Sequence, residues 1–241
     1  MKVMLVISYD GSKFFGFQRQ NTLRNVQGEL EHALTVVLGE NIVVKGAGRT
    51  DRGVHAYGQV VHFETTKNIA NLKRKLNNFL EDIRIKRIKI VSDDFHARHS
   101  AIKKTYIYKV DLSKKRNSKY YLSINYPVDI KKMKKTAKLL EGTHDFRNFV
   151  SGERLDYVTH IESIKIIKFN QIIYFIFKGA GFYRYMIRNL VGALLEVGHG
   201  KVTHDLVKMM LNLENCEKRL PTSSPNGLYL YKIKYERKMF K

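Results

Sequence analysis

Hydrophobic positions follow two different periods along the chain. Apolar, often β-branched runs predict strands, whereas apolar residues spaced three or four apart predict helices. The predicted strands cover 3–9, 42–47, 59–65, 83–91, 101–112, 161–169, 171–180 and 228–236. The predicted helices cover 26–38, 69–80, 129–141, 182–197 and 203–213. Asn170 separates two of the strands as a hairpin turn. Strands outnumber helices and some are hairpin-linked, which predicts an α+β fold with a largely antiparallel sheet.

The second half of the chain resembles the first in the order of its elements. We therefore expect two domains, 1–100 and 101–241. No repeat is visible at the level of residues, so this similarity rests on element order alone. No low-complexity linker separates the halves, and we expect them to share an interface.

Composition narrows the class of protein. With 44% apolar residues the chain can bury a core, and no apolar run approaches the length of a membrane span. The single cysteine, Cys216, excludes a disulfide scaffold and a cysteine-based metal cluster, and suits a reducing compartment. The first apolar run lacks a small-residue cleavage site, so we interpret it as a strand rather than a signal peptide. These observations predict a cytoplasmic protein.

The charge points to a polyanionic partner. The chain has 44 Lys and Arg against 22 Asp and Glu, a net charge of +22, and nucleic acid is the commonest partner of so basic a protein. Lys103–Lys138 holds 12 basic and 2 acidic residues, interleaved with aromatic and aliphatic ones. We expect much of this excess to contact phosphate. The alternative for 131–138 is the solvated face of a helix, and charge alone does not say whether the partner is only held or also changed.

Residues 46–56 form the most unusual segment, GAGRTDRGVHA. Asp51 lies between Arg49 and Arg52, and nearby cations favour an ionised carboxylate. Such a group can act as nucleophile, general base or electrostatic stabiliser. The structural alternative is a hairpin loop in which Asp-Arg-Gly forms a turn and Arg49 pairs with a neighbouring acid. The spacing of glycines and lysines does not match a P-loop.

Two further segments have candidate functional residues. Tyr106 shares a strand face with Tyr108 and Val110, so it is either a core aromatic or a platform on which a flipped base stacks. Arg184 and Arg188 stand one helical turn apart, and one of them could reach inward to a carboxylate or remain at the surface.

Metal and cofactor chemistry has little support in the sequence. The nine histidines are scattered, and the closest pair, His96 and His99, has no third ligand nearby. No nucleotide fingerprint, nucleophile elbow or zinc-protease motif occurs. We therefore predict chemistry without metal or cofactor.

Five segments together resemble the TruA family of tRNA pseudouridine synthases. The central one is GRTDRGVHAYGQVVHFET (48–65), and the others occur in the order typical of the family: YDGSKFFGFQRQ (9–20) followed by NVQGELEHAL, FHARHSAIKKTYIY (95–108), FYRYMIRNLVGALLEVG (182–198) and GLYLYKIKY (227–235). Arg52 departs from the pattern, since the family usually has Ala there.

The resemblance implies a fold, a reaction and a set of site residues. The fold would be two ferredoxin-like halves joined into one extended sheet, with helices on one side and an RNA cleft on the other. The reaction would convert uridine to pseudouridine at positions 38 to 40 of the tRNA anticodon stem-loop, by a homodimer that needs no cofactor or metal. The catalytic aspartate would be Asp51, with Arg49, Tyr106, Arg188 and Leu228 around it.

Two other classes of function remain as alternatives to this enzyme. A non-catalytic RNA-binding module would not require Asp51. The second is a base-modifying enzyme of another type, and the absence of a donor-binding motif or a cysteine nucleophile weighs against it.

Overall fold

The computed structural model describes residues 1–113, 118–214 and 220–241. Cys216 and the basic residues at 114–116 therefore lie outside the described residues. The chain forms two compact units. The first contains Met1–Lys104 and Tyr229–Lys241, and the second contains Thr105–Leu228. The two domains expected from the sequence, 1–100 and 101–241, stay a prediction, and the structure adds that the last strand packs with the N-terminal elements.

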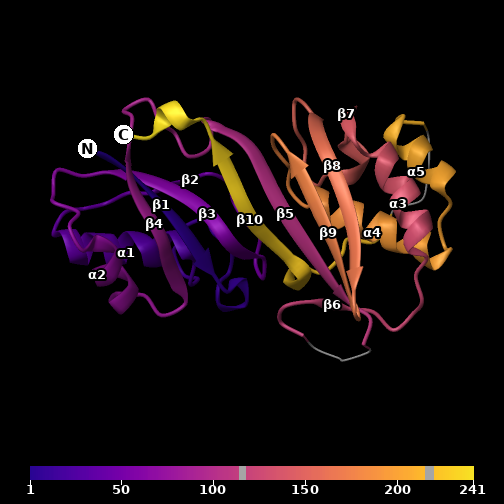
Figure 1. The fold of residues 1–241 in the computed structure, drawn as a ribbon, viewed down its shortest axis with the longest axis horizontal. Helices are drawn as coiled ribbons and strands as arrows, with labels where there is room; N and C mark the ends of the chain where they lie inside the picture. Colours follow the sequence, from indigo (N-terminus) through magenta and orange to yellow (C-terminus); the bar gives the residue numbers. More distant parts are fainter. Residues whose placement is uncertain (114–117, 215–219) are drawn as a thin grey trace. The chain divides into compact units, whose positions relative to one another are not determined.

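The strands of the first unit lie in the order β4-β1-β3-β10, with β2 paired to β3. Their bounds are β1 (Lys2–Tyr9), β2 (Lys45–Gly46), β3 (His55–Glu64), β4 (Ile83–Val91) and β10 (Leu228–Tyr235). The pairs β1–β3, β1–β4 and β2–β3 are antiparallel, whereas β10 runs parallel to β3 with Tyr229 opposite His55. Because β10 comes from the end of the chain, two segments distant in sequence lie side by side at the start of β3 (Figure 1).

Two helices, α1 (Val26–Leu38) and α2 (Leu72–Phe79), accompany this sheet. The ends of α1 agree with the prediction because the local signals are strong: the Asn25 side chain accepts from Gly28 N at 2.8 Å, and Gly39 ends the helix with φ of 68°. Leu30 and Leu34 are fully buried, as are Val3 and Leu5 of β1. The helix and the strand thus form one apolar core.

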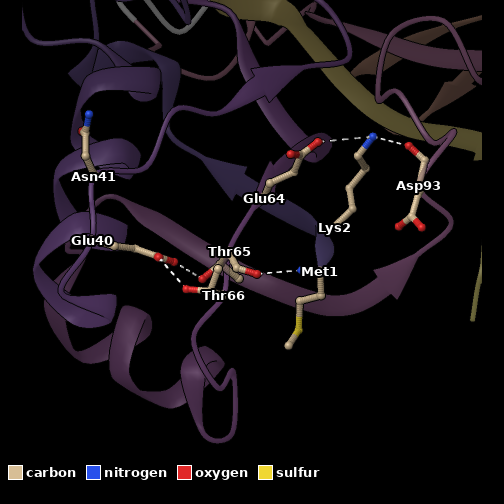
Figure 2. Close-up of a pocket in the computed structure, with 8 residues that line it drawn as sticks. All are labelled: Met1, Lys2, Glu40, Asn41, Glu64, Thr65, Thr66 and Asp93. Atoms are coloured by element: carbon tan, nitrogen blue, oxygen red, sulfur yellow. Dashed lines mark hydrogen bonds and ion pairs between the residues drawn. The ribbon is translucent and has the colours of Figure 1, made fainter.

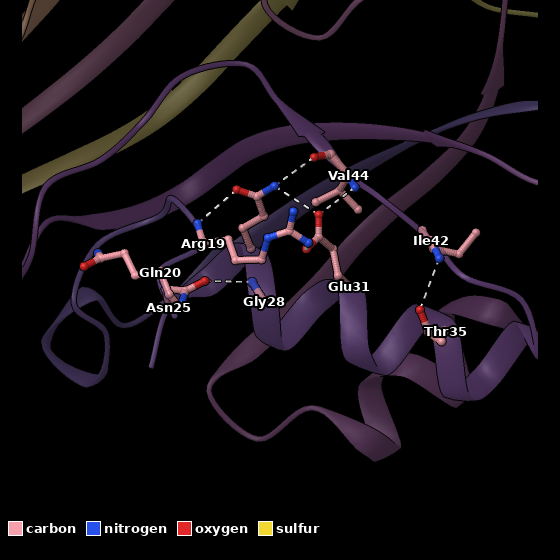
Figure 3. A network of polar contacts seen from close by, with 9 residues as sticks. Arg19, Gln20, Asn25, Gly28, Glu31, Thr35, Ile42 and Val44 are labelled. Carbon is pink, nitrogen blue, oxygen red and sulfur yellow. Dashed lines mark hydrogen bonds and ion pairs between the residues drawn. The ribbon is translucent and has the colours of Figure 1, made fainter. Parts of the chain in front are cut away.

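The strand predicted at 42–47 is wrong except at Lys45 and Gly46, which form β2. Ile42 and Val44 are buried and alternate with exposed residues, which is the pattern of a strand. Their backbone groups, however, bond to side chains of α1. Thr35 Oγ1 accepts from Ile42 N at 3.2 Å, and Glu31 Oε1 accepts from Val44 N at 3.0 Å (Figure 3). The helix therefore satisfies polar groups that a neighbouring strand would otherwise bond.

The second unit has strands in the order β5-β9-β8-β7, with β6 paired to β5. The bounds are β5 (Ala101–Asp111), β6 (Leu122–Ser123), β7 (Gly142–Asp145), β8 (Val158–Phe169) and β9 (Ile172–Gly179). Asn170 forms the predicted hairpin turn between β8 and β9 with φ of 52°. The short strands β6 and β7 were not predicted, because they hold too few residues to show a hydrophobic period.

The helices of the second unit are α3 (Ile130–Leu139), α4 (Met186–His199) and α5 (His204–Leu211). Helix α3 packs against α4, α5 and β8 (Figure 1). Met133 and Ala137 of α3 are buried, while its lysines 131, 132, 134 and 135 are exposed. The predicted solvated face of this helix is therefore present, and phosphate contact by the same lysines stays a prediction.

The α+β class is confirmed, and most of the assigned pairs are antiparallel. The ferredoxin-like description, the joined sheet and the RNA cleft stay predictions. Across the described ranges, no helix combines the length and apolar character that a membrane crossing requires.

Candidate active site

The loop that carries Asp51 connects β2 to β3 in the first unit. We call residues 47–54 the Asp51 loop. Val54 N donates to Asp51 O at 3.1 Å, and Gly53 has φ of 81°. The Asp-Arg-Gly turn of the structural alternative is therefore present. It leaves Asp51 half-buried while Arg49 and Arg52 on either side are exposed.

A second loop, residues 10–25, packs against the Asp51 loop. Phe17 N donates to Thr50 O at 3.0 Å, and the Arg52 guanidinium lies 4.3 Å from the ring centroid of Phe15. Gly11 lies so close to Val54 that an added Cβ would overlap the Val54 carbonyl group. The short glycine-rich segment thus allows two backbones to meet without a side chain between them.

Buried hydrogen bonds fix the Asp51 loop from the side of the sheet. Tyr9 Oη and Thr50 Oγ1 are 2.8 Å apart, and Gln59 Nε2 donates to Gly48 O at 2.9 Å. Burial raises the pKa of Tyr9 to about 12, although hydrogen bonds to Thr50 and Gln59 oppose the shift. Tyr9 is therefore a neutral anchor for the residue before Asp51.

A lysine reaches the start of the same loop. Lys104 Nζ donates to Ala47 O at 2.8 Å. The Ala47 and Gly48 carbonyl groups, which immediately precede Arg49, thus both accept hydrogen bonds from side chains of neighbouring strands.

His55, the histidine of the GRTDRGVHA segment, is buried at the start of β3. Gly11 N donates to its Nδ1 at 3.1 Å, and its ring stacks on Tyr229 with centroids 4.6 Å apart. This histidine therefore supports the contact between the two loops and the pairing of β10 with β3.

Tyr106 and Tyr108 lie on the part of β5 that belongs to the second unit. Tyr106 is half-buried, with the edge of its ring against Phe182 at a centroid distance of 5.4 Å. Tyr108 is fully buried and donates to Ser224 O at 2.6 Å. Tyr108 is the core aromatic of the pair, and Tyr106 keeps part of its ring accessible.

Arg188, in the first turn of α4, is held in a fixed orientation. Its Nε donates to Ser223 O at 2.7 Å, and its guanidinium lies 4.6 Å from the ring centroid of Tyr185. Ser223 N also donates to Arg188 O at 3.1 Å, so the two residues are bonded twice. Arg184, one turn earlier, is exposed. Arg188 is thus the half-buried arginine of the pair.

The segment 221–228 brings Leu228 to this region of the second unit. Gly192 of α4 has no room for a side chain because the Pro221 carbonyl group lies against it. A Cβ on Gly227 would lie 2.7 Å from both the Lys109 carbonyl oxygen and the Tyr108 ring. Leu228 follows and is 6% exposed. The segment therefore contacts α4 at Pro221 and β5 at Gly227.

The predicted site residues thus fall into two groups. Asp51 and Arg49 share one loop of the first unit, while Tyr106, Arg188 and Leu228 belong to the second. Contacts between the groups stay a prediction. Sequence reasoning missed Tyr9 and Lys104. Lys104 could have been found from the sequence because it stands two residues before Tyr106, and alternate residues of a strand share a face.

A pocket of about 380 Å³ occurs at the other ends of β1 and β3, where Lys2 and Glu64 face each other at 3.5 Å (Figure 2). Glu40 and Asp93 also line it. Three carboxylates beside one lysine repel phosphate, so this pocket is a poor candidate for an RNA site.

Histidine rings gather at one further place, where His62, His96 and His99 form a row with centroid distances of 4.8 and 4.4 Å. His62 Nδ1 accepts from Ala97 N at 3.1 Å. In the part of the chain that the structure describes, no three His, Cys, Asp or Glu side chains are arranged to hold a metal ion. Chemistry without metal or cofactor stays a prediction.

Asp51 lies between two exposed arginines on a chain of net charge +22, and this charge suits a polyanionic partner. Comparison with known proteins defines the enzyme. A family model described as tRNA pseudouridine synthase matches residues 5–100 and 136–236. The chain therefore belongs to the tRNA pseudouridine synthase family, and it is an isomerase that converts uridine to pseudouridine.

Individual relatives agree with this membership. A protein of Streptococcus pneumoniae strain P1031 named tRNA pseudouridine synthase A is 42% identical, over 95% of this chain and 97% of the relative. A protein of the same name from strain Hungary19A-6 is 41% identical over the same shares. The similarity includes the Asp51 loop and α4, and it favours the enzyme over a non-catalytic RNA-binding module.

Proposed function

We propose that this enzyme isomerises uridines at positions 38 to 40 of the tRNA anticodon stem-loop and that Asp51 starts the reaction. The observation that supports Asp51 most directly is the Asp51 loop itself. Hydrogen bonds with Phe17 and Tyr9 fix Thr50, and the turn closed by Val54 N fixes the carbonyl group of Asp51. A carboxylate that begins a reaction needs such a rigid support.

The reaction breaks the N1–C1′ bond of the uridine, rotates the base and joins C5 to C1′. The proton on C5 is lost and N1 gains one, so the atoms balance without a second substrate. Asp51 would attack the base or the sugar, or would remove a proton to give a glycal. All three routes require the carboxylate to be ionised, and the neighbouring Arg49 and Arg52 favour that form.

The other site residues have roles that follow from their chemistry. Tyr106 stacks on the flipped base and helps to remove the C5 proton. Arg188 keeps Asp51 ionised and oriented through a charge-assisted hydrogen bond. Arg49 holds the flipped nucleotide and its phosphate. Leu228 excludes water, so that the detached base rejoins the sugar.

The substrate must be unpaired before it can react. Flipping a base out of a stem costs a few kcal/mol, which stacking on an aromatic ring and phosphate contacts offset. We propose that the basic residues on α3 and β5 supply part of these contacts, and that the enzyme acts as a cytoplasmic homodimer, as the resemblance to the TruA family implies.

The test of Asp51 is a comparison of two aspartate variants. Asp51→Asn keeps the shape of the side chain but removes its charge, whereas Asp94→Asn makes the same change at an exposed turn. With unmodified tRNA, mapped for pseudouridine by chemical probing, Asp51→Asn should lose at least about 10³-fold in rate. Binding of tRNA should stay within a few-fold. Normal turnover by Asp51→Asn would exclude the assignment.

The test of position uses the tRNA rather than the enzyme. Transcripts in which the uridine at position 38, 39 or 40 is replaced by cytidine should each lose the pseudouridine signal at that position alone. Signals that arise in another stem or loop would show that the enzyme belongs to the family but selects different uridines.

A further inference from the structure

Lys104 is a half-buried cation at the entrance to the Asp51 loop. It lies on β5, and its Nζ donates to Ala47 O at 2.8 Å. Its Nζ is 3.5 Å from the position that a Cβ on Gly48 would occupy. Gly48 precedes Arg49, so the ammonium group lies within three residues of Asp51 along the loop. An ammonium group has three donors, and one carbonyl group occupies one of them.

The surroundings of Lys104 are unfavourable for a positive charge. Burial lowers the pKa of Lys104 to about 8, and the positive charge of Arg98 lowers it further. Among the described residues, no carboxylate forms an ion pair with Lys104, and Arg98 is the charged group that acts on it. A buried charge normally has an opposite charge beside it. Lys104 and Arg98 together therefore form a positive site that an anion would stabilise.

The anion that fits this site is a phosphate group. Arg49 and Arg52 of the same loop are exposed, so the loop offers further positive charge to the same ligand. A lysine binds phosphate as a point charge and needs no forked geometry. Resting on the proposed function, we propose that Lys104 binds a backbone phosphate of the RNA beside the target uridine.

This contact positions the substrate. A phosphate that accepts from Lys104 Nζ would fix the RNA backbone beside the start of the Asp51 loop, from which the base can rotate toward Asp51. The same bond to Ala47 O ties the ligand to the start of the Asp51 loop. Binding of the phosphate also favours the charged form of Lys104, so tRNA binding should weaken as the pH rises through about 8 and should take up a proton there.

The test compares Lys104→Met, Lys104→Arg and the control Lys73→Met, which removes an exposed lysine from α2. The dissociation constant for unmodified tRNA is measured against salt at pH 7 and against pH from 7 to 9.5. Lys104→Met should bind roughly tenfold more weakly, and its salt slope should fall by about 0.7 to 0.9. Lys104→Arg should retain the salt slope and bind tRNA at pH 9.5 as it does at pH 7, because a guanidinium stays charged. Lys73→Met should match the wild type.

Two outcomes would overturn the proposal. A salt slope for Lys104→Met equal to that of the wild type would show that Lys104 only ties the loop, even if the turnover number falls. Equal weakening of the wild type and of Lys104→Arg toward pH 9.5 would assign the pH dependence to another group. Circular dichroism shows whether Lys104→Met folds. If it does not, the pH dependence of the wild type and of Lys104→Arg tests the proposal by itself.

Failure of the proposed function would appear elsewhere. The wild type would then give no pseudouridine at positions 38 to 40, whereas the changes in salt slope concern binding and need no turnover.

Discussion

Arg188 illustrates how one side chain is oriented by its own neighbours. Its Nε is bonded to Ser223 O at 2.7 Å, and its guanidinium lies 4.6 Å from the centroid of the Tyr185 ring. Lysine has one ammonium group and no planar fork, so it cannot replace the guanidinium in both contacts. Arg188→Lys should therefore lose on the order of 100-fold in turnover number while its melting temperature changes little.

Arg184→Lys is the matched control, since Arg184 lies one turn earlier on the same segment and is exposed. Single-turnover rates on unmodified tRNA measure both variants. Equal rates for Arg188→Lys and Arg184→Lys would show that the fork at Arg188 has no role in the reaction.

His62 makes stability depend on pH. Burial lowers the pKa of His62 to about 4, and the charges of His96, Lys2 and Lys45 add to this. The unfolded chain takes up the proton near pH 6.5, whereas the folded protein resists it. Stability is therefore complete above about pH 6.5 and falls as the pH decreases toward 4, by up to about 3 kcal/mol.

Urea unfolding at pH 7.5, 6, 5 and 4.5 tests this expectation. His62→Asn keeps an acceptor for Ala97 N but does not titrate, so its free energy of unfolding should vary less across the series than that of the wild type. His96 leaves a residual slope, because burial lowers its pKa as well. His32→Asn, at an exposed position, should keep the full dependence. A His62→Asn slope as steep as that of the wild type would contradict the assignment.

At the scale of elements, the Asp51 loop is supported by its contact with the loop of residues 10–25. Gly11→Ala would place a methyl group against the Val54 carbonyl, so the loops must separate. We expect a loss of about 1 to 3 kcal/mol in the free energy of unfolding, as for other overpacked positions, together with a lower turnover number. Gly181→Ala enters open space and should change stability by less than about 0.5 kcal/mol. Equal stability of the two variants, from thermal unfolding, would show that the loops are not tightly packed.

The bounds of an element could be predicted where capping residues next to it in the sequence define them. They could not be predicted where pairing with a distant segment defines them. Helix α1 begins and ends as predicted because Asn25 and Gly39 cap it. Residues 42–44 have the burial pattern of a strand but are not one, because side chains of α1 bond the backbone of Ile42 and Val44. The start of β3 was placed four residues late, because His55 and Ala56 are paired by β10 from the far end of the chain.

The same limit applies to the candidate site. Asp51 and Arg49 could be identified because their unusual loop is contiguous in sequence. Tyr9 and Lys104 could not, since their hydrogen bonds to Thr50 and Ala47 connect residues more than 40 positions apart. A pattern of neighbouring residues contains no information on such contacts until the fold brings them together.

At the scale of the whole molecule, the proposed function requires Asp51 and Arg188 to act on the same uridine. In a homodimer, one arrangement is that a single chain supplies both residues. In a homodimer, the alternative is that each site takes Asp51 from one subunit and Arg188 from the other. Co-expression of Asp51→Asn and Arg188→Ala chains with different tags, followed by purification of the mixed dimer, separates these arrangements.

If one chain supplies both residues, every site of the mixed dimer has one defect, and the rate should stay at the level of the parent variants. If the subunits exchange residues, one of the two symmetry-related sites has both natural residues, and about half of the wild-type rate should return. Wild-type chains with the same two tags give the reference rate. A protein that elutes as a monomer in light scattering, with a mass near 28.1 kDa, would contradict the proposed homodimer and would leave the single-chain site as the sole arrangement.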